Sequence, residues 1–467
     1  MAKYKAYPEY KDSGVEWLGE LPAHWTTLAI KHVAQLNPSK SCISIEKMKG
    51  MCSFIPMEKL KFNSLCLDEI KDVTDVYNGY TYFENEDILI AKVTPCFENK
   101  NMVVARDLNN GVGFGSSEIY VLRCNDIINN DFLFYRLQED SFMFIAEGAM
   151  TGAGGLKRVP SEVLNNFKFG LPSKKEQSII VDFLKHETAK IDNLIEKQQQ
   201  LIKLLKEKHQ AVISHAVTKG LNPGVPMKDS GVEWLGKVPA HWIKQKLVSV
   251  SDGSRGSFVN GPFGSDLLAE ELRDHGIPVV YIRDIKPTGY SRKSTVFVTP
   301  MKAKQLDVCK LEPGDVIVSK VGDPPGDACV YPVGEPSAII TQDVIRIRVD
   351  RDKFSPEFIV YLLNSDFGRM VANDISVEGT RKRVSLGDFK STRFVLPPLK
   401  ESLNIVRYLN GECEKLSCTI AKATQAVALM QERRTALISA AVTGKIDVRD
   451  WVAPDTQDAE EPQEATA

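Results

Sequence analysis

Apolar residues recur every three or four positions in two long stretches of the chain, 173–221 and 399–447, and neither stretch contains proline. This spacing is typical of coiled-coil helices. It predicts two long antiparallel helices that pair with each other, although two helices lying separately on their own domains would show a similar pattern. The expected inter-helix packing positions are Ile191, Leu194, Leu201, Leu205 and Val212 in the first helix and Leu416, Ile420, Val427, Met430 and Leu437 in the second.

Short apolar runs rich in β-branched residues precede each predicted helix, at 88–93, 119–123, 316–321 and 344–349. Gly, Pro and Asn bound these runs, as expected for strands. Shorter helices are predicted at 131–145 and 356–372, where aromatic residues have helical spacing. The fold class is therefore α+β, with two similar globular domains that each contain a curved sheet.

The chain contains an internal repeat. The segment KDSGVEWLGELPAHW at 11–25 returns as KDSGVEWLGKVPAHW at 228–242, with thirteen of fifteen positions identical. Leu171-Pro172 with Glu176 reappears as Leu396-Pro397 with Glu401, at an offset of 225. Repeats at fixed offsets indicate that a whole structural unit has been duplicated. Trp17, Trp25, Trp234 and Trp242 all lie in the two copies of the tryptophan motif.

These observations predict seven segments. Because 228–242 follows the first long helix directly, its twin at 11–25 should pack near the end of the second, at 441–451. The segments are a repeat motif at 1–25, a domain at 26–172, a central helix at 173–221, the second motif copy at 222–242, a second domain at 243–398, a C-terminal helix at 399–447 and an acidic, disordered tail at 448–467.

Composition narrows the class of protein. The 467 residues carry a formal net charge of -2, and residues 453–467 hold five acids and no base. The body of the chain is therefore slightly basic, and a site for an anionic polymer must come from local clusters.

We expect no membrane association and a cytoplasmic location, since no apolar run is long enough for a span or a signal peptide. Nine cysteines without a C-x-x-C pair favour free thiols.

Several enzyme patterns occur, but each is weak. Asp323-Pro324-Pro325-Gly326 resembles an amino-methyltransferase motif whose final aromatic residue is replaced here by glycine. Asp87 with Glu98 and Lys100 fits a loose nuclease pattern, without a counterpart in the other half. The glycines at 111, 113 and 115 are interpreted as loop residues. A chain without its own catalytic residues and without a metal site is the leading hypothesis, while a self-sufficient methyltransferase or nuclease and a purely protein-binding scaffold remain alternatives.

Basic residues lie in glycine-rich loops at the same place in both halves, around Lys157-Arg158 and around Lys382-Arg383. Glycine allows the backbone to approach a phosphate closely, and Lys and Arg neutralise it. The candidate DNA-binding residues are Lys92, Lys100, Arg106, Lys157 and Arg158 in the first domain and Arg255, Arg283, Arg292, Lys293, Lys320, Arg381, Lys382 and Arg383 in the second.

The tryptophan motif, the duplication and the paired helices resemble the DNA-specificity subunit of type I restriction-modification systems. The stretches 94–99, 113–118, 261–265 and 276–278 also look like this family. The resemblance implies two target-recognition domains that each read one part of a split, asymmetric DNA site. Its DNA-facing loops would be 92–106, 113–118 and 152–158 in the first domain and 255–265, 283–293, 320–328 and 379–383 in the second.

The same resemblance implies the partners and cofactors. The chain would bind double-stranded DNA, two DNA-methyltransferase (modification) subunits and restriction subunits that translocate and cut DNA. It would hold no cofactor itself, because S-adenosylmethionine, ATP and Mg²⁺ are expected on those partner subunits.

Overall fold

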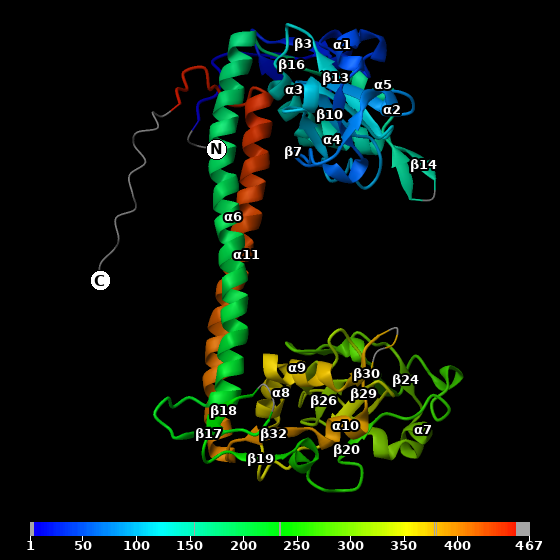
Figure 1. Ribbon diagram of the computed structural model, residues 1–467, viewed down its shortest axis with the longest axis vertical. Helices are drawn as coiled ribbons and strands as arrows, with labels where there is room; N and C mark the ends of the chain where they lie inside the picture. The colour runs from blue at the N-terminus through cyan, green and yellow to red at the C-terminus, as the bar shows by residue number, and fades with distance from the viewer. Residues whose placement is uncertain (1–3, 154, 233–234, 378, 380, 454–467) are drawn as a thin grey trace. The chain divides into compact units, whose positions relative to one another are not determined.

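The computed structural model describes residues 4–153, 155–232, 235–377, 379 and 381–453, without the side chain of Cys42 (Figure 1). Trp234, Gly154 and the tail beyond residue 453 therefore lie outside the described residues. Contacts divide the chain into two units, one formed by Met1–Gln198 with Ala426–Ala467 and the other by Gln199–Gln425. Each unit contains part of both long helices.

The first unit contains two four-stranded sheets. One has the order β11-β10-β13-β4 and the other β8-β5-β12-β9, in which only the β5–β12 pair is parallel. The strands are β4 (Ala34–Leu36), β5 (Met51–Ile55), β8 (Ile70–Asp72), β9 (Thr81–Glu84), β10 (Ile88–Ala91), β11 (Met102–Val104), β12 (Val112–Gly115) and β13 (Ile119–Cys124). Two-stranded pairs are formed by β1 (Tyr10–Asp12) with β2 (Glu20–Pro22), β3 (Thr26–Ala29) with β16 (Lys168–Leu171), β6 (Leu60–Lys61) with β7 (Ser64–Leu65) and β14 (Thr151–Ala153) with β15 (Leu156–Arg158).

The second unit repeats these sheets in the same strand order. Its sheets run β27-β26-β29-β20 and β24-β21-β28-β25, again with one parallel pair, β21–β28. The strands are β20 (Phe258–Asn260), β21 (Ile277–Val280), β24 (Phe297–Val298), β25 (Lys310–Leu311), β26 (Val316–Ser319), β27 (Ala328–Val330), β28 (Ala338–Ile340) and β29 (Val344–Ile347). Two-stranded pairs are β17 (Met227–Asp229) with β18 (Lys237–Pro239), β19 (Ile243–Lys246) with β32 (Arg393–Leu396), β22 (Ile285–Lys286) with β23 (Gly289–Tyr290) and β30 (Ser376–Val377) with β31 (Arg383–Val384). The predicted duplication and α+β fold are confirmed.

The two short helices predicted from aromatic spacing are each two helices separated by one residue. They are α3 (Asn130–Gln138) and α4 (Asp140–Gly148) in the first unit, and α8 (Pro356–Asn364) and α9 (Asp366–Asp374) in the second. Glu139 and Ser365 are the separating residues, and their side chains accept hydrogen bonds from the first-turn amides of α4 and α9. These caps start the second helix of each pair. The other short helices are α1 (Ile45–Met48), α2 (Val73–Val76), α5 (Ser161–Asn166), α7 (Pro300–Gln305) and α10 (Leu386–Ser391).

The interpretation of the glycines at 113 and 115 as loop residues was wrong. Both lie in the buried strand β12. A Cβ atom on Gly113 would approach the Phe83 ring to 2.1 Å, and one on Gly115 would approach the Ile55 carbonyl oxygen to 2.6 Å. These glycines therefore allow close packing within the sheet. Only residues 116–118 of the expected DNA-facing loop 113–118 lie outside the strand.

The two long helices are α6 (Lys174–Lys219) and α11 (Leu399–Val442). Each begins just after a proline and ends before a glycine with positive φ, Gly220 at 75° and Gly444 at 72°, as is usual for helix termini. None of the helices among the described residues combines the length and the apolar character needed to cross a membrane.

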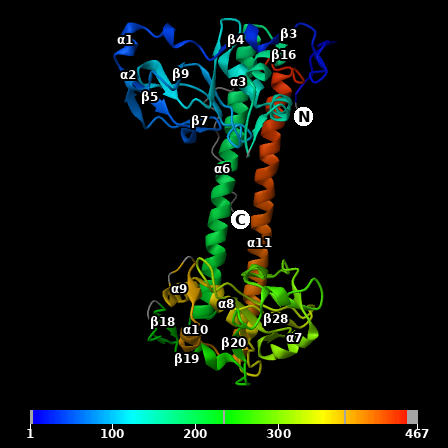
Figure 2. The ribbon, with the colours of Figure 1, turned by 90° about the vertical axis from the view of Figure 1, so that its right-hand side faces the viewer.

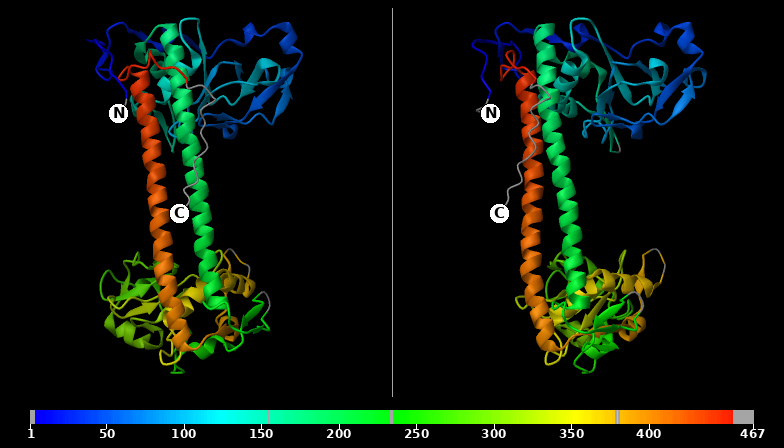
Figure 3. Two further views of the ribbon diagram at one scale, coloured as in Figure 1. Left: turned by 90° about the vertical axis from the view of Figure 1, so that its left-hand side faces the viewer. Right: turned by 60° about the vertical axis from the view of Figure 1, so that its left-hand side comes forward.

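The helices pack together within each unit (Figures 2 and 3). In the first unit, Ile180 and Leu184 of α6 share a hydrophobic cluster with Ile438 and Val442 of α11. Further along α6, Asp192 accepts a hydrogen bond from Arg434 Nε at 2.8 Å. Residues further along α6 therefore contact residues that lie earlier in α11, so the two helices are antiparallel. In the second unit, one cluster joins Ile213, Ala216 and Val217 to Ile405, Val406 and Leu409.

The less exposed face of α6 differs from the predicted inter-helix positions at two places, each by one residue. Leu194 and Leu201 are 53% and 42% exposed, whereas their neighbours Ile195 and Ile202 are less exposed. The less exposed positions thus follow a strict seven-residue spacing, at Ile191, Ile195, Gln198, Ile202, Leu205, His209 and Val212. In α11 all five predicted positions are buried or partly buried: Leu416, Ile420, Val427, Met430 and Leu437.

The tryptophan motif lies at the end of the second helix, as predicted. Tyr10 Oη donates a hydrogen bond to the Gly444 carbonyl oxygen at 3.0 Å, and the Asp447 amide donates to the Lys5 carbonyl oxygen at 2.7 Å. Trp25 belongs to the same hydrophobic cluster as Ala440 and Ala441. The two ends of the described chain therefore meet within the first unit.

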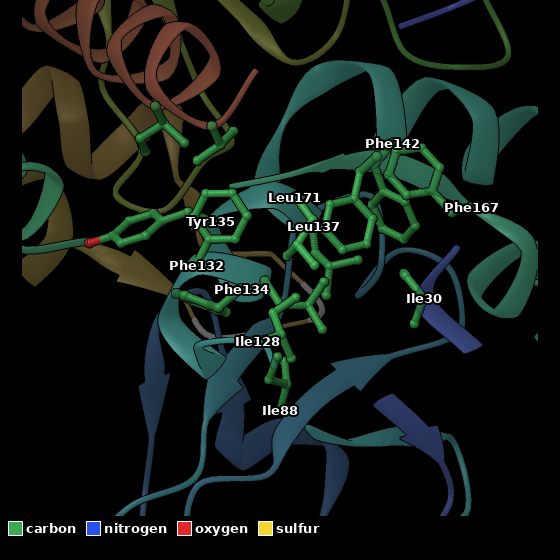
Figure 4. Packing of buried hydrophobic residues seen from close by; sticks show 14 of the residues in the cluster. Ile30, Ile88, Ile128, Phe132, Phe134, Tyr135, Leu137, Phe142, Phe167 and Leu171 are labelled. Carbon is green, nitrogen blue, oxygen red and sulfur yellow. The ribbon is translucent and has the colours of Figure 1, made fainter. Parts of the chain in front are cut away.

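The first unit has an aromatic core between its sheet, its short helices and the ends of the long helices (Figure 4). Phe142 of α4 and Phe167 meet edge to face, with ring centroids 5.0 Å apart, and Phe132 packs against Trp25. This core connects the domain to the long helices.

Candidate nucleic-acid interface

In the first unit, the loop after β10 meets the hairpin β14–β15, whose two strands are exposed along their length. Val93 and Arg158 form an antiparallel bridge. The Lys92 amide donates to the Glu118 carbonyl oxygen at 3.0 Å, and the Val159 amide donates to the Lys92 carbonyl oxygen at 2.9 Å. These backbone contacts bring Lys92, Glu118 and Arg158 together at the surface.

The three side chains form a small ionic group, which we call the first cluster. Arg158 Nε and Nη2 donate to the two carboxylate oxygens of Glu118 at 2.9 and 2.8 Å. Lys92 Nζ lies 4.0 Å from Glu118 Oε2 and 5.1 Å from the centre of the Tyr120 ring. The hydrogen bonds from Arg158 hold the pKa of Glu118 below its ordinary value. Two cations thus share one carboxylate.

The second unit has the same arrangement, formed by Lys320, Asp343 and Arg383, which we call the second cluster. The Lys320 amide donates to the Asp343 carbonyl oxygen at 2.8 Å, and the Val384 amide donates to the Lys320 carbonyl oxygen at 3.0 Å. Val321 and Arg383 form the equivalent bridge. Arg383 Nη2 lies 3.1 Å from Asp343 Oδ1, but that oxygen makes no aligned hydrogen bond. The contact is therefore an ion pair by proximity, looser than Arg158 with Glu118.

Lys320 is half-buried beside Arg383. Burial lowers the pKa of Lys320, and the nearby Arg383 charge lowers it further. A hollow of about 560 Å³ opens beside this cluster. It is lined by Ile282, Val321, Asp343, Val377, Gly379, Arg381 and Arg383. Two arginines and one aspartate are the charged residues of this lining, beside three apolar side chains.

Four other predicted cations are exposed and have no side-chain partner among the described residues: Lys157, Arg255, Lys293 and Arg381. Such side chains are available to a ligand without breaking an existing contact. Next to Arg255 in sequence, the carbonyl oxygen of Gly256 accepts a hydrogen bond from the buried guanidinium of Arg346, which also donates to the Lys310 carbonyl oxygen. Sequence reasoning missed Arg346, whose counterpart in the first half is Val121.

The remaining predicted cations already have polar partners. Lys100 Nζ donates to the Gln138 carbonyl oxygen at 2.8 Å and lies 3.1 Å from Asp140. Arg106 bonds to Glu86 and Asp131. In the second unit, Arg283 donates to Ser294, Arg292 to Glu335 and Lys382 to Asn373. The structure therefore does not place Lys100 or Arg106 in the first cluster.

Glu118 and Asp343 were not among the predicted site residues. A signal for them was present, because the offset of 225 that pairs Arg158 with Arg383 also pairs Glu118 with Asp343. The prediction considered only cations, so it omitted the acids that orient them.

The weak nuclease pattern does not form a site. Asp87 accepts hydrogen bonds from Arg123 at 2.8 and 2.6 Å, and Asp315 and Arg348 repeat this pair in the second unit. Lys100 is bound elsewhere, as described above. Among the described residues, no group of three or more His, Cys, Asp or Glu side chains could hold a metal ion.

Part of the sequence is similar to known proteins. Residues 22–204 match the family described as type I restriction modification DNA specificity domain. The chain is 36% identical over 214 residues to the type I restriction enzyme EcoAI specificity subunit of Escherichia coli, covering 45% of this chain and 35% of that protein. It is 32% identical over 197 residues to the EcoEI specificity subunit of Escherichia coli, covering 42% and 32%. These matches span about a third of the length of each relative.

Solved structures show the same fold over most of the chain. The HsdS subunit from Thermoanaerobacter tengcongensis aligns with a TM-score of 0.54 at 16% identity, covering 91% of this chain and 98% of that one. A chain from a study of complex assembly and conformational transition of the type I R-M system aligns with a TM-score of 0.68 at 17% identity, covering 91% and 99%. The resemblance of this chain to the DNA-specificity subunits of type I restriction-modification systems is thus confirmed.

Proposed function

We propose that the chain is the DNA-reading subunit of a type I restriction-modification complex. Each unit contributes one target-recognition domain, and each domain reads one half of a split, asymmetric site in duplex DNA. The observation that carries the proposal is the pair of clusters: two domains with different sequences hold two cations and one acid at the same place. Lys157, Arg255, Lys293 and Arg381 are exposed and have no side-chain partner among the described residues, so they add positive charge that is available to DNA.

We also propose the partners that the resemblance to type I specificity subunits implies. The chain docks two modification subunits, which bind S-adenosylmethionine and methylate adenine, and restriction subunits, which use ATP and Mg²⁺ to translocate and cut DNA. The specificity subunit itself holds no cofactor and carries out no bond-making step. The complex acts in the cytoplasm, where the DNA is.

Methylation mapping in cells tests this proposal. We expect a split adenine-methylated motif in cells that carry the gene and its partners, and loss of that motif when this gene alone is deleted. Replacing residues 243–398 with the corresponding domain of another specificity subunit should change one half of the motif and leave the other half and the spacer unaltered. Restoring the native gene should restore the native motif.

Two outcomes would count against the proposal. A methylome that is unchanged after deletion would show that the chain does not direct modification. Methylation or cleavage of DNA by the purified chain alone, in the presence of S-adenosylmethionine or Mg²⁺, would show that it is an enzyme in its own right.

A further inference from the structure

The similarity between the two clusters is confined to a few residues. In both units the lysine amide bonds to the carbonyl oxygen of the acid, and the arginine forms a bridge with the residue after the lysine. The adjacent cations differ in their surroundings, because Lys157 has no side-chain partner in the described part of the chain, whereas Lys382 donates to Asn373 Oδ1 at 2.8 Å. The shared part is therefore the Lys–acid–Arg group and its backbone support.

If two domains read different base sequences, a group that is the same in both cannot provide the difference. The parts of DNA that are the same at every site are its phosphates and sugars. Resting on the proposed function, we infer that the two clusters bind the DNA backbone at equivalent positions in the two half-sites, while residues that differ between the domains read the bases.

The charges of the clusters suit a phosphate. Each cluster has two cations and one carboxylate, so one positive charge remains uncompensated. In the first cluster Glu118 occupies Nε and Nη2 of Arg158, and Nη1 remains free to donate. Lys92 Nζ, 4.0 Å from Glu118, is beyond hydrogen-bond distance from it. One arginine nitrogen and one ammonium group are therefore left to donate to phosphate oxygens.

The acids act as positioning residues. Two hydrogen bonds to one carboxylate fix both the place and the plane of the Arg158 guanidinium. A side chain that is already ordered loses less conformational entropy when it binds. Glu118 thus favours binding although its own charge repels a phosphate, whereas Asp343 holds Arg383 only through the looser ion pair.

Base contacts then fall to other side chains. Arg255, Lys293 and Arg381 in the second domain are exposed and have no side-chain partner among the residues that the structure describes. None of the three belongs to the shared Lys–acid–Arg group.

Equilibrium binding of the full complex tests the inference, with the chain assembled with its partner subunits. The duplexes are the methylated motif identified in cells, the same duplex with single base pairs changed in each half, and an unrelated duplex. We expect Arg158→Ala to weaken binding to all of them by one common factor. The slope of log affinity against log salt should become less steep by about 0.9 for each phosphate that the variant no longer neutralises.

Arg383→Ala should have the same effect, and the double variant should change the slope by about 1.8, because two separate phosphates are released. Lys11→Ala, which removes one exposed charge from β1, is the matched control and should leave the slope unchanged. An unchanged slope for Arg158→Ala would overturn the inference. Relaxed discrimination at any base pair, including one that both halves share, would also overturn it.

The acids have a separate test. Glu118→Ala should weaken binding despite removing a negative charge, whereas Glu118→Asp, which copies the acid of the second cluster, should retain most of the affinity. Tighter binding by Glu118→Ala would overturn the positioning role. If the wild-type complex shows no preference for the mapped motif, the proposed function itself fails, and this result is distinct from a failure of the inference.

Discussion

Replacing Glu176 with alanine should lower the free energy of unfolding of the first unit by about 2–6 kcal/mol, since each of two buried donors left without an acceptor costs about 1–3 kcal/mol. The buried carboxylate of Glu176 accepts hydrogen bonds from Tyr7 Oη at 2.6 Å and Trp25 Nε1 at 3.0 Å, and it contacts His24 Nε2 at 2.9 Å. Alanine would leave the tyrosine and tryptophan donors unsatisfied inside the core.

The duplicated half provides the comparison. Glu401 has the same role toward Trp242 Nε1 at 3.1 Å and His241 Nε2 at 2.6 Å. It is more exposed than Glu176, and only the tryptophan among its donors is buried. We therefore expect Glu401→Ala to cost about 1–3 kcal/mol, in the second unit only.

Hydrogen exchange followed by mass spectrometry can assign each loss to its unit. Peptides from the first unit should lose protection in Glu176→Ala, and peptides from the second in Glu401→Ala. Glu162→Ala, which removes an exposed carboxylate of α5, is the control and should leave protection unaltered. Equal protection in Glu176→Ala and this control would show that the carboxylate does not stabilise the junction between the tryptophan motif and α6.

The repeat explains why so much of the fold could be predicted. Matches at constant offset defined two equivalent halves, and the position of the second tryptophan motif after α6 led directly to the packing of the first motif against the end of α11. His24 and His241, the equivalent histidines of the two motif copies, contact Glu176 and Glu401. These predictions depended on order along the chain, which a sequence records directly.

Predictions were less successful where they depended on the exact register of a helix or on contacts between residues distant in sequence. At two steps of α6 the chain offers adjacent apolar residues, Leu194 with Ile195 and Leu201 with Ile202. Either series has steps of three and four, so periodicity alone could not choose between them. Gly113 faces the Phe83 ring, which lies thirty positions away, and no local pattern reveals such an approach.

The candidate site was predicted in part for a similar reason. The glycine-flanked basic loops were found because both halves have them, and they do contain Arg158 and Arg383. The local charge balance could not be found from cations alone, since it depends on Glu118 and Asp343 from another strand connection. Lys100 was assigned to the interface because it is basic, but in the fold it bonds to the end of α3 and to Asp140.

Replacing Glu139 with alanine should cost the first unit about 3–5 kcal/mol, because it would leave the charge of Arg136 buried without an opposite charge beside it. Arg136 has no exposed surface. Its Nη1 lies 2.5 Å from Glu139 Oε2, and the other oxygen of Glu139 accepts a hydrogen bond from Ser439 of α11 at 3.2 Å. The pair thus connects the short helices of the domain to the long helix.

In the second unit, uncharged residues occupy the positions equivalent to this buried ion pair. Leu362 and Ser365 occupy the positions equivalent to Arg136 and Glu139, and Ser365 caps α9 as Glu139 caps α4. The double variant Arg136→Leu with Glu139→Ser copies that solution, and replacing a buried ion pair as a whole is often nearly neutral. It should therefore recover most of the stability that Glu139→Ala loses. A double variant as unstable as Glu139→Ala would show that the unpaired charge is not the cause.

The dependence of stability on pH gives an independent measurement. Burial by itself raises the pKa of Glu139, but the charge of Arg136 and the hydrogen bonds from Ser141 outweigh it, so the pKa lies below its ordinary value of 4.5. A lowered pKa in the folded state stabilises the protein above pH 4.5, and this contribution disappears as the pH falls through the folded-state value. Hydrogen-exchange protection of residues 130–148 should therefore fall more steeply with acid in the wild type than in the double variant. Parallel acid profiles would show that the ionised carboxylate of Glu139 does not stabilise this junction.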